Sequence, residues 1–159
     1  MDAGTIITAA VLVAVVALPI LMMKRSRDKI KRKLLAEVTQ RAKDENSVIS
    51  LHDFWGFTML GIDNNLKKLF VARWDDDKVF QDRIELANYK VCQIFKSGFE
   101  GGRRSNPSAT KVMGIRLISK DAKGQDPLIE IYNDDKDLQA EGGREFIEKW
   151  IDKINNILK

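Results

Sequence analysis

The sequence predicts an α+β protein in which an N-terminal transmembrane helix precedes an antiparallel β-sandwich or partly open barrel that a C-terminal amphipathic helix caps. Residues 3–23 contain no charged side chain. Residues 46–132 alternate short runs of β-forming residues with turn residues. Residues 144–158 repeat apolar side chains at helical spacing. The expected parts are an anchor over residues 1–23, a basic juxtamembrane helix or linker over 24–45, and a β domain with its closing helix over 46–159.

The uncharged run over residues 3–23 is long enough to cross a bilayer. At about 1.5 Å of rise per residue it spans about 31 Å, against a hydrocarbon core of about 30 Å. Ten of its residues are Ile, Leu or Val, which together favour insertion by about 3–6 kcal/mol. The alternative is a cleaved signal peptide, which has a shorter apolar region, a basic cluster before it and small residues at the cleavage site. The bulky residues 21–24 and the late basic cluster favour an uncleaved anchor.

Charge asymmetry predicts the orientation of the anchor. Asp2 and the α-amino group are the only charges before the run, whereas basic residues follow it closely. Basic flanks stay in the cytoplasm. We therefore expect a single-pass inner (plasma) membrane protein with its N-terminus outside and its C-terminal domain in the cytoplasm. The residues expected to contact membrane lipids are Lys24, Arg25, Arg27, Lys29, Lys31, Arg32 and Lys33.

The positive charge of the chain belongs to the tether and not to the domain. Residues 24–43 hold nine Lys or Arg and two acidic residues, whereas residues 44–159 hold 18 basic and 20 acidic residues. A nucleic-acid-binding domain carries its basic stripe on the folded module. Nucleic acid is therefore not an expected partner.

Helical periodicity continues into the basic segment. Ile30, Leu34 and Val38 recur four residues apart, which predicts a helix over residues 26–43 that continues from the anchor. Its narrow apolar face has two expected locations, the bilayer surface or its own domain.

Seven short β-forming runs predict an antiparallel meander. The step from Asp63 to Asn65 is typical of a hairpin turn, and the run from Asp75 to Lys78 is typical of the next turn. The expected strands cover residues 47–52, 56–62, 66–74, 78–80, 88–96, 111–120 and 127–132.

The C-terminal segment has the strongest helical pattern in the chain. Phe146, Ile147, Trp150 and Ile154 recur at the spacing of one helix face, and charged residues fill the other face. An apolar face of this length must be buried against other apolar side chains. We expect Trp150 to fill the open mouth of the barrel or the face of the sheet.

Residues 61–71, GIDNNLKKLFV, resemble a hairpin of small, largely uncharacterised bacterial single-pass membrane proteins with a pleckstrin-homology-like cytoplasmic domain. The resemblance implies six or seven antiparallel strands capped by one helix, and it implies no agreed activity. Eukaryotic members of this fold often bind phosphoinositides through basic residues in the loop between their first two strands. We expect that loop at residues 53–55, which contain no Lys or Arg. Further similar segments are residues 84–94, 115–118, 129–132 and 150–158.

The longest break between predicted strands, residues 97–110, is a candidate partner loop. Loops of this length in a small domain are functional or disordered, and the sequence leaves both alternatives open. Arg103 and Arg104 would meet phosphate or an acidic partner, with Phe99 inserted beside them.

No pattern in the sequence predicts a catalytic site, a cofactor or a metal. His52 is the only histidine and Cys92 the only cysteine, so a metal site lacks ligands. The acidic turns at residues 75–77 and 134–137 lack the spaced ligands and the glycine bend of a calcium loop.

These observations favour a non-enzymatic interaction or adaptor module at the cytoplasmic face of the membrane. The expected partners are membrane lipids and a protein whose identity the sequence does not provide, and no oligomeric state is predicted. The alternative function is recognition of anionic lipid headgroups by the domain itself.

Overall fold

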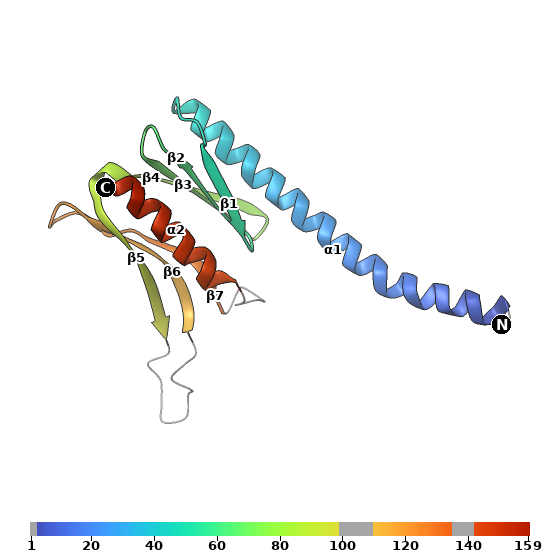
Figure 1. Ribbon diagram of the computed structural model, residues 1–159. Helices are drawn as coiled ribbons and strands as arrows, with labels where there is room; N and C mark the ends of the chain where they lie inside the picture. Colours follow the sequence, from blue (N-terminus) through green and yellow to red (C-terminus); the bar gives the residue numbers. More distant parts are fainter. Residues whose placement is uncertain (1–2, 99–109, 135–141) are drawn as a thin grey trace, which may run out of the picture.

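In the part of the chain that the structure describes, two α-helices and two antiparallel sheets form the fold, which confirms the predicted α+β class (Figure 1). The computed structural model describes residues 3–98, 110–134 and 142–159. The elements in chain order are α1 (Ala3–Asp44), β1 (Leu51–Trp55), β2 (Thr58–Asp63), β3 (Lys68–Asp75), β4 (Lys78–Glu85), the 3-10 helix η1 (Leu86–Asn88), β5 (Tyr89–Gly98), β6 (Thr110–Ser119), β7 (Leu128–Asn133) and α2 (Gly143–Leu158).

Both sheets are meanders of consecutive antiparallel strands. The first sheet has the order β1-β2-β3-β4 and the second has the order β5-β6-β7. Each of the seven predicted strands overlaps an observed strand, and the predicted turn after Asp63 joins β2 to β3. Three predicted boundaries are wrong by three or more residues, namely the start and the end of the first strand and the end of the fourth. The first strand runs from Leu51 to Trp55, and the backbone N–H of Val48 before it bonds to the Asp63 carboxylate. The fourth strand continues to Glu85.

The central strands of the first sheet, β2 and β3, are covered on both faces. Leu60, Ile62 and Leu69 pack into the main core with the second sheet and α2. Met59 and Phe70 point to the opposite face, where α1 covers them. All six residues of β2 are therefore buried, which explains why residues 59–62 at its centre are apolar without alternation.

Helix α2 closes the main core, as its periodicity predicts. Trp150 is fully buried at the centre of its apolar face, which confirms the expectation for this residue, and Ile147 and Ile154 are buried on either side of it. The amide of Asn155 also binds strand β5 directly. Its Oδ1 accepts the backbone N–H of Cys92 at 2.8 Å, and its Nδ2 donates to the Cys92 carbonyl at 2.9 Å.

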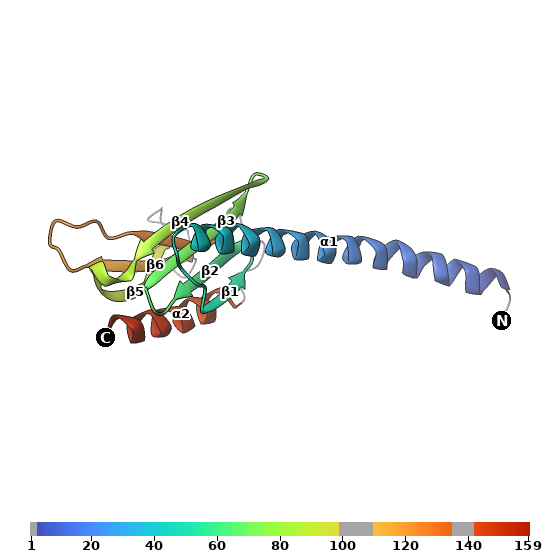
Figure 2. The same ribbon diagram turned by 90° about the horizontal axis from the view of Figure 1, so that it is seen from above.

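Helix α1 is continuous from Ala3 to Asp44, and only its C-terminal half touches the domain (Figures 1 and 2). Leu34, Val38 and Ala42 are buried against the outer face of the first sheet. Of the two locations expected for this apolar face, the structure shows the second, its own domain. Within the part of the chain whose side chains the structure describes, which begins at Val11, no helix has the length and apolarity needed to cross a membrane.

The loop expected between the first two strands is misplaced by the sequence analysis. Residues 53–55 lie inside β1, because this strand extends to Trp55. The connection to β2 is the pair Gly56 and Phe57, where Gly56 adopts a left-handed backbone with φ of 55°. This connection also lacks Lys and Arg.

Candidate functional site

From Val11 to Met23, α1 presents large apolar side chains on every side of the helix. Their exposed fractions range from 54% for Leu21 to 70% for Met22. Consecutive helix positions differ by about 100° in direction, so this set covers no single stripe. The exposed side chains are those of Val11, Leu12, Val13, Val15, Val16, Leu18, Ile20, Leu21, Met22 and Met23.

The seven basic residues expected to contact lipid fall into two groups. Five of them are exposed and make no ion pair with any described residue, and these are Lys24, Arg25, Arg27, Lys29 and Arg32. The other two lie over aromatic rings of the domain. The Nζ of Lys33 is 4.6 Å from the ring centre of Trp74, and the Nζ of Lys31 is 5.7 Å from that of Phe54. The sequence does not predict this second role, because helical periodicity does not reveal which rings a lysine contacts.

Polar contacts fix the end of α1 to the first sheet. Arg83 donates to the Glu45 carboxylate at 2.7 Å, and the Lys68 ammonium lies 3.5 Å from the same group. The hydrogen bond from Arg83 is the main reason that the pKa of Glu45 lies below its usual value. The negative charge of Glu45 is thus held against β3 and β4 at the point where α1 ends.

Asp63 joins the segment after α1 to the β2–β3 turn. It is 2% exposed, and its carboxylate accepts the backbone N–H groups of Val48 at 2.9 Å, Asn65 at 2.9 Å and Leu66 at 3.0 Å. Burial raises the pKa of Asp63, but these hydrogen bonds outweigh burial and hold it below its usual value. An ionised carboxylate therefore organises both segments.

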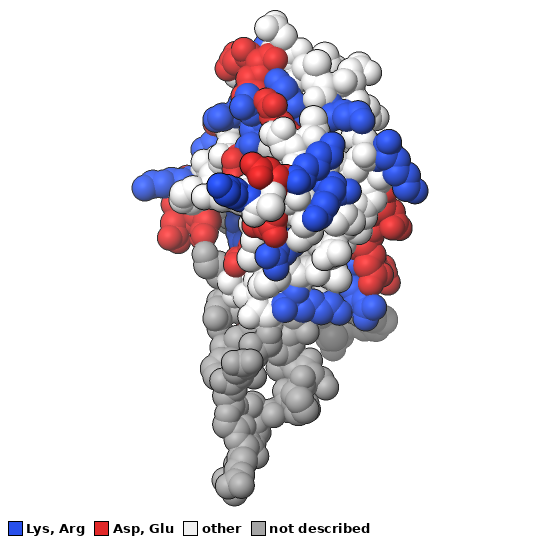
Figure 3. Space-filling model, turned by 90° about the vertical axis from the view of Figure 1, so that its left-hand side faces the viewer, with Lys and Arg blue, Asp and Glu red and all other residues white. Residues whose placement is uncertain are grey.

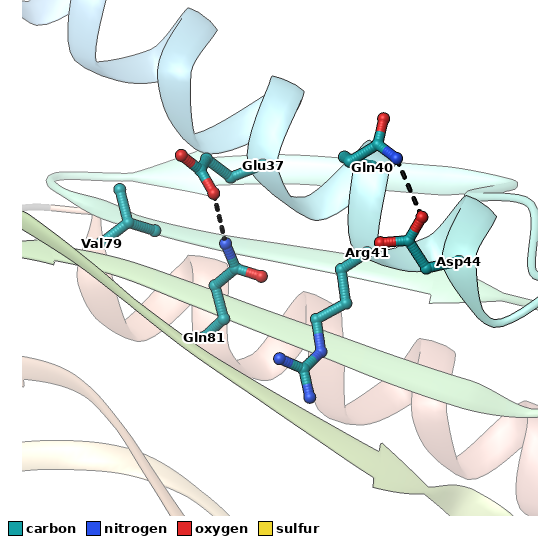
Figure 4. A pocket seen from close by; sticks show the side chains of 6 residues that line it. All are labelled: Glu37, Gln40, Arg41, Asp44, Val79 and Gln81. Atoms are coloured by element: carbon teal, nitrogen blue, oxygen red, sulfur yellow. Dashed lines mark hydrogen bonds between the residues drawn. The ribbon is translucent and has the colours of Figure 1, made fainter.

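Two open grooves border the docked part of α1. The first has a volume of about 400 Å³, lies where α1 leaves the domain, and is lined by Ile30, Phe57, Arg73, Trp74, Asp75, Asp76 and Asp77. The second has a volume of about 440 Å³, lies between α1 and β4, and is lined by Glu37, Gln40, Arg41, Asp44, Val79 and Gln81 (Figure 4). Neither groove is predictable from the sequence, because each is built from segments that are distant in sequence.

The cysteine, the histidine, the candidate metal ligands and the candidate partner loop remain to be located. Cys92 is buried, and burial raises the pKa of its thiol to about 12. His52 lies exposed on β1, with its ring edge-to-face with Phe54 at 5.8 Å. Among the described residues, no group of three or more His, Cys, Asp or Glu side chains could hold a metal ion. The candidate partner residues Phe99, Arg103 and Arg104 lie outside the described residues.

The face of the domain turned away from the N-terminal half of α1 carries mixed charge. Figure 3 shows Lys and Arg interspersed with Asp and Glu on this face. An interspersed surface produces no large field of one sign. This agrees with the near balance of charges in residues 44–159.

No protein family, no curated protein and no solved structure matches the chain.

Proposed function

We propose that the chain is a single-pass membrane protein whose domain is a non-enzymatic interaction module at the cytoplasmic face of the inner (plasma) membrane. The observation that carries this proposal is the uncovered surface of α1, where every large apolar side chain described from Val11 to Met23 is more than half exposed. A helix that is apolar on every side is usually buried on every side. Lipid surrounds a helix completely, whereas packing against one face of a domain covers only one side of it. In the sequence, the uncharged run begins at Ala3, and its full length matches the hydrocarbon core.

The charged residues near the run support lipid contact by the tether. Lys24, Arg25, Arg27 and Lys29 are exposed and follow the apolar run directly. Each basic residue near an anionic membrane surface contributes about 1 kcal/mol of attraction. The groove at the exit of α1 instead carries three aspartates, residues 75–77, against the single cation Arg73, and this net negative charge repels anionic headgroups. We therefore assign lipid binding to the tether and protein binding to the domain.

The element order supports a pleckstrin-homology-like assignment of the domain. A four-stranded meander, a three-stranded meander and one closing helix follow one another along the chain. The same order is what the resemblance of residues 61–71 implies. Many unrelated functions occur on one fold, so the proposed module rests on the tether and the surfaces of the domain, and not on the fold.

Protease accessibility tests the proposed placement. The full chain is expressed in bacterial cells, and protease is added to right-side-out and to inverted inner-membrane vesicles. We expect digestion of the domain only in inverted vesicles, because the basic flank keeps residues 24–159 in the cytoplasm. Digestion from the outside, or recovery of the chain in the supernatant of both preparations, would contradict the proposal.

A further inference from the structure

Strand β4 is an open edge of the first sheet. Among the described strands it pairs only with β3. The turn between them is tight, since Asp76 and Asp77 both have positive φ and Asp75 faces Lys78. Counted from such a two-residue turn, the backbone groups of every second β4 residue point away from β3. Val79 and Gln81 are therefore the first two positions at which β4 offers unpaired N–H and C=O groups to a further strand.

The groove beside this edge lies between α1 and β4 (Figure 4). Val79 and Gln81 contribute their side chains to one wall, and α1 contributes the other wall. The helix is fixed here by a hydrogen bond of 3.0 Å from Gln81 Nε2 to Glu37 Oε2. A segment that added to β4 would thus place every second side chain in a preformed groove, as strand-addition sites do.

Two carboxylates in the groove have no cationic partner among the residues that the structure describes. Glu37 accepts from the neutral amide of Gln81, and Asp44 accepts from the neutral amide of Gln40 at 2.9 Å. The guanidinium of Arg41 is directed to Glu45, at 3.7 Å. No described cation lies within ion-pair distance of Glu37 or Asp44. The charge of the groove complements a Lys or Arg side chain.

We propose that this groove docks an extended, Lys- or Arg-bearing segment of a partner protein, which adds to β4 as a fifth strand of the first sheet. This inference deepens the proposed function and rests on it for the class of partner. The cytoplasmic flanks of membrane-spanning helices carry an excess of Lys and Arg. Glu37 lies about 21 Å along α1 from Met23, so the basic flank of a neighbour in the same membrane reaches the groove.

The test uses the full chain in neutral detergent micelles and an acetylated, amidated peptide of eight residues that alternates Lys and Val. We expect saturable binding and slowed amide hydrogen exchange at Val79 and Gln81, measured by NMR. Glu37→Gln combined with Asp44→Asn should raise Kd about tenfold, since two ion pairs are lost. Glu145→Gln combined with Asp152→Asn removes the same charge from exposed positions on α2 and should leave Kd unchanged.

A proline variant tests strand addition separately from charge. Gln81→Pro removes an N–H that points away from β3, so the fold is retained, as thermal unfolding will verify, and binding is lost. Gln81→Ala removes the same side-chain hydrogen bond to Glu37 but keeps the backbone N–H, so it should retain binding. Three results would each overturn the docking inference. They are an equal rise in Kd for the α2 control pair, slowed amide exchange at β1 or β7 instead of β4, and peptide binding that does not saturate. Because the assay needs no bilayer, its failure together with correct protease topology contradicts the docking inference alone. Binding together with wrong topology contradicts the membrane placement alone.

Discussion

Asp63 shows how one side chain couples two parts of this chain. Its carboxylate holds the segment after α1 through Val48 and shapes the β2–β3 turn through Asn65 and Leu66. The sequence places Asp63 in a turn, where aspartate is common. It does not reveal the bond to Val48, because that contact depends on where α1 docks.

The lowered pKa of Asp63 predicts a loss of stability in acid. Since the folded pKa lies below the unfolded value of about 3.9, the stabilisation is complete above that value and is lost as pH falls through the folded pKa. Asp63→Asn should lower the free energy of unfolding by about 1–3 kcal/mol at neutral pH, with a smaller difference below pH of about 3. Urea unfolding followed by tryptophan fluorescence measures this. Asp77→Asn, at an exposed turn position, is the control, and an equal loss there would refute the account.

Asn155 holds β5 to α2 by two hydrogen bonds to the backbone of Cys92. Asn155→Leu leaves a partly buried N–H and C=O without partners, which should lower the free energy of unfolding by about 1–3 kcal/mol. Asn156→Leu, at the exposed neighbouring position, should change it by less than about 0.5 kcal/mol. Equal effects of the two substitutions in urea unfolding would show that the contact contributes nothing.

At the scale of elements, the docked half of α1 determines whether tether and domain move as one unit. Leu34 lies on the docked face of α1 and is fully buried against the outer face of the first sheet. Leu34→Ala should lower the free energy of unfolding by about 2–5 kcal/mol and speed amide exchange in residues 30–44 and in β3. Lys43→Ala, at an exposed position of the same helix, is the control. Unchanged exchange in Leu34→Ala would mean that the helix is not held at this position.

Sequence patterns predict the existence of the elements better than their contacts. Runs of β-forming residues bounded by turn residues locate all seven strands, and the helical period locates α2 with Trp150 at its centre. The extent of β4 is missed because its residues Gln81 to Glu85 are mostly polar, as suits an exposed edge. The docking of α1 is left open because an apolar stripe shows which face is buried and not what covers it.

At the scale of the molecule, α1 is one continuous helix whose first part is apolar and uncovered and whose last part is docked on the domain. Its 42 residues extend about 63 Å, and only the last part contacts the domain. Because the helix is continuous and docked at one end, the orientation of its apolar part determines the orientation of the domain as well as its distance. In the proposed placement, both grooves beside α1 are therefore held at fixed heights above the bilayer, which the sequence alone could not predict because they join distant segments.

The partition of the chain between membrane and soluble fractions tests the membrane placement most directly. Val13→Lys combined with Val16→Lys places two charges in the middle of the apolar run, at about 2.5–3.5 kcal/mol each, which exceeds or matches the insertion energy of the run. Val48→Lys combined with Leu66→Lys changes two exposed apolar residues of the domain and serves as the control. After an alkaline wash, we predict the unmodified chain and the control pair in the membrane pellet and the Val13/Val16 variant in the supernatant. Retention of that variant in the pellet, or release of the unmodified chain, would contradict the account.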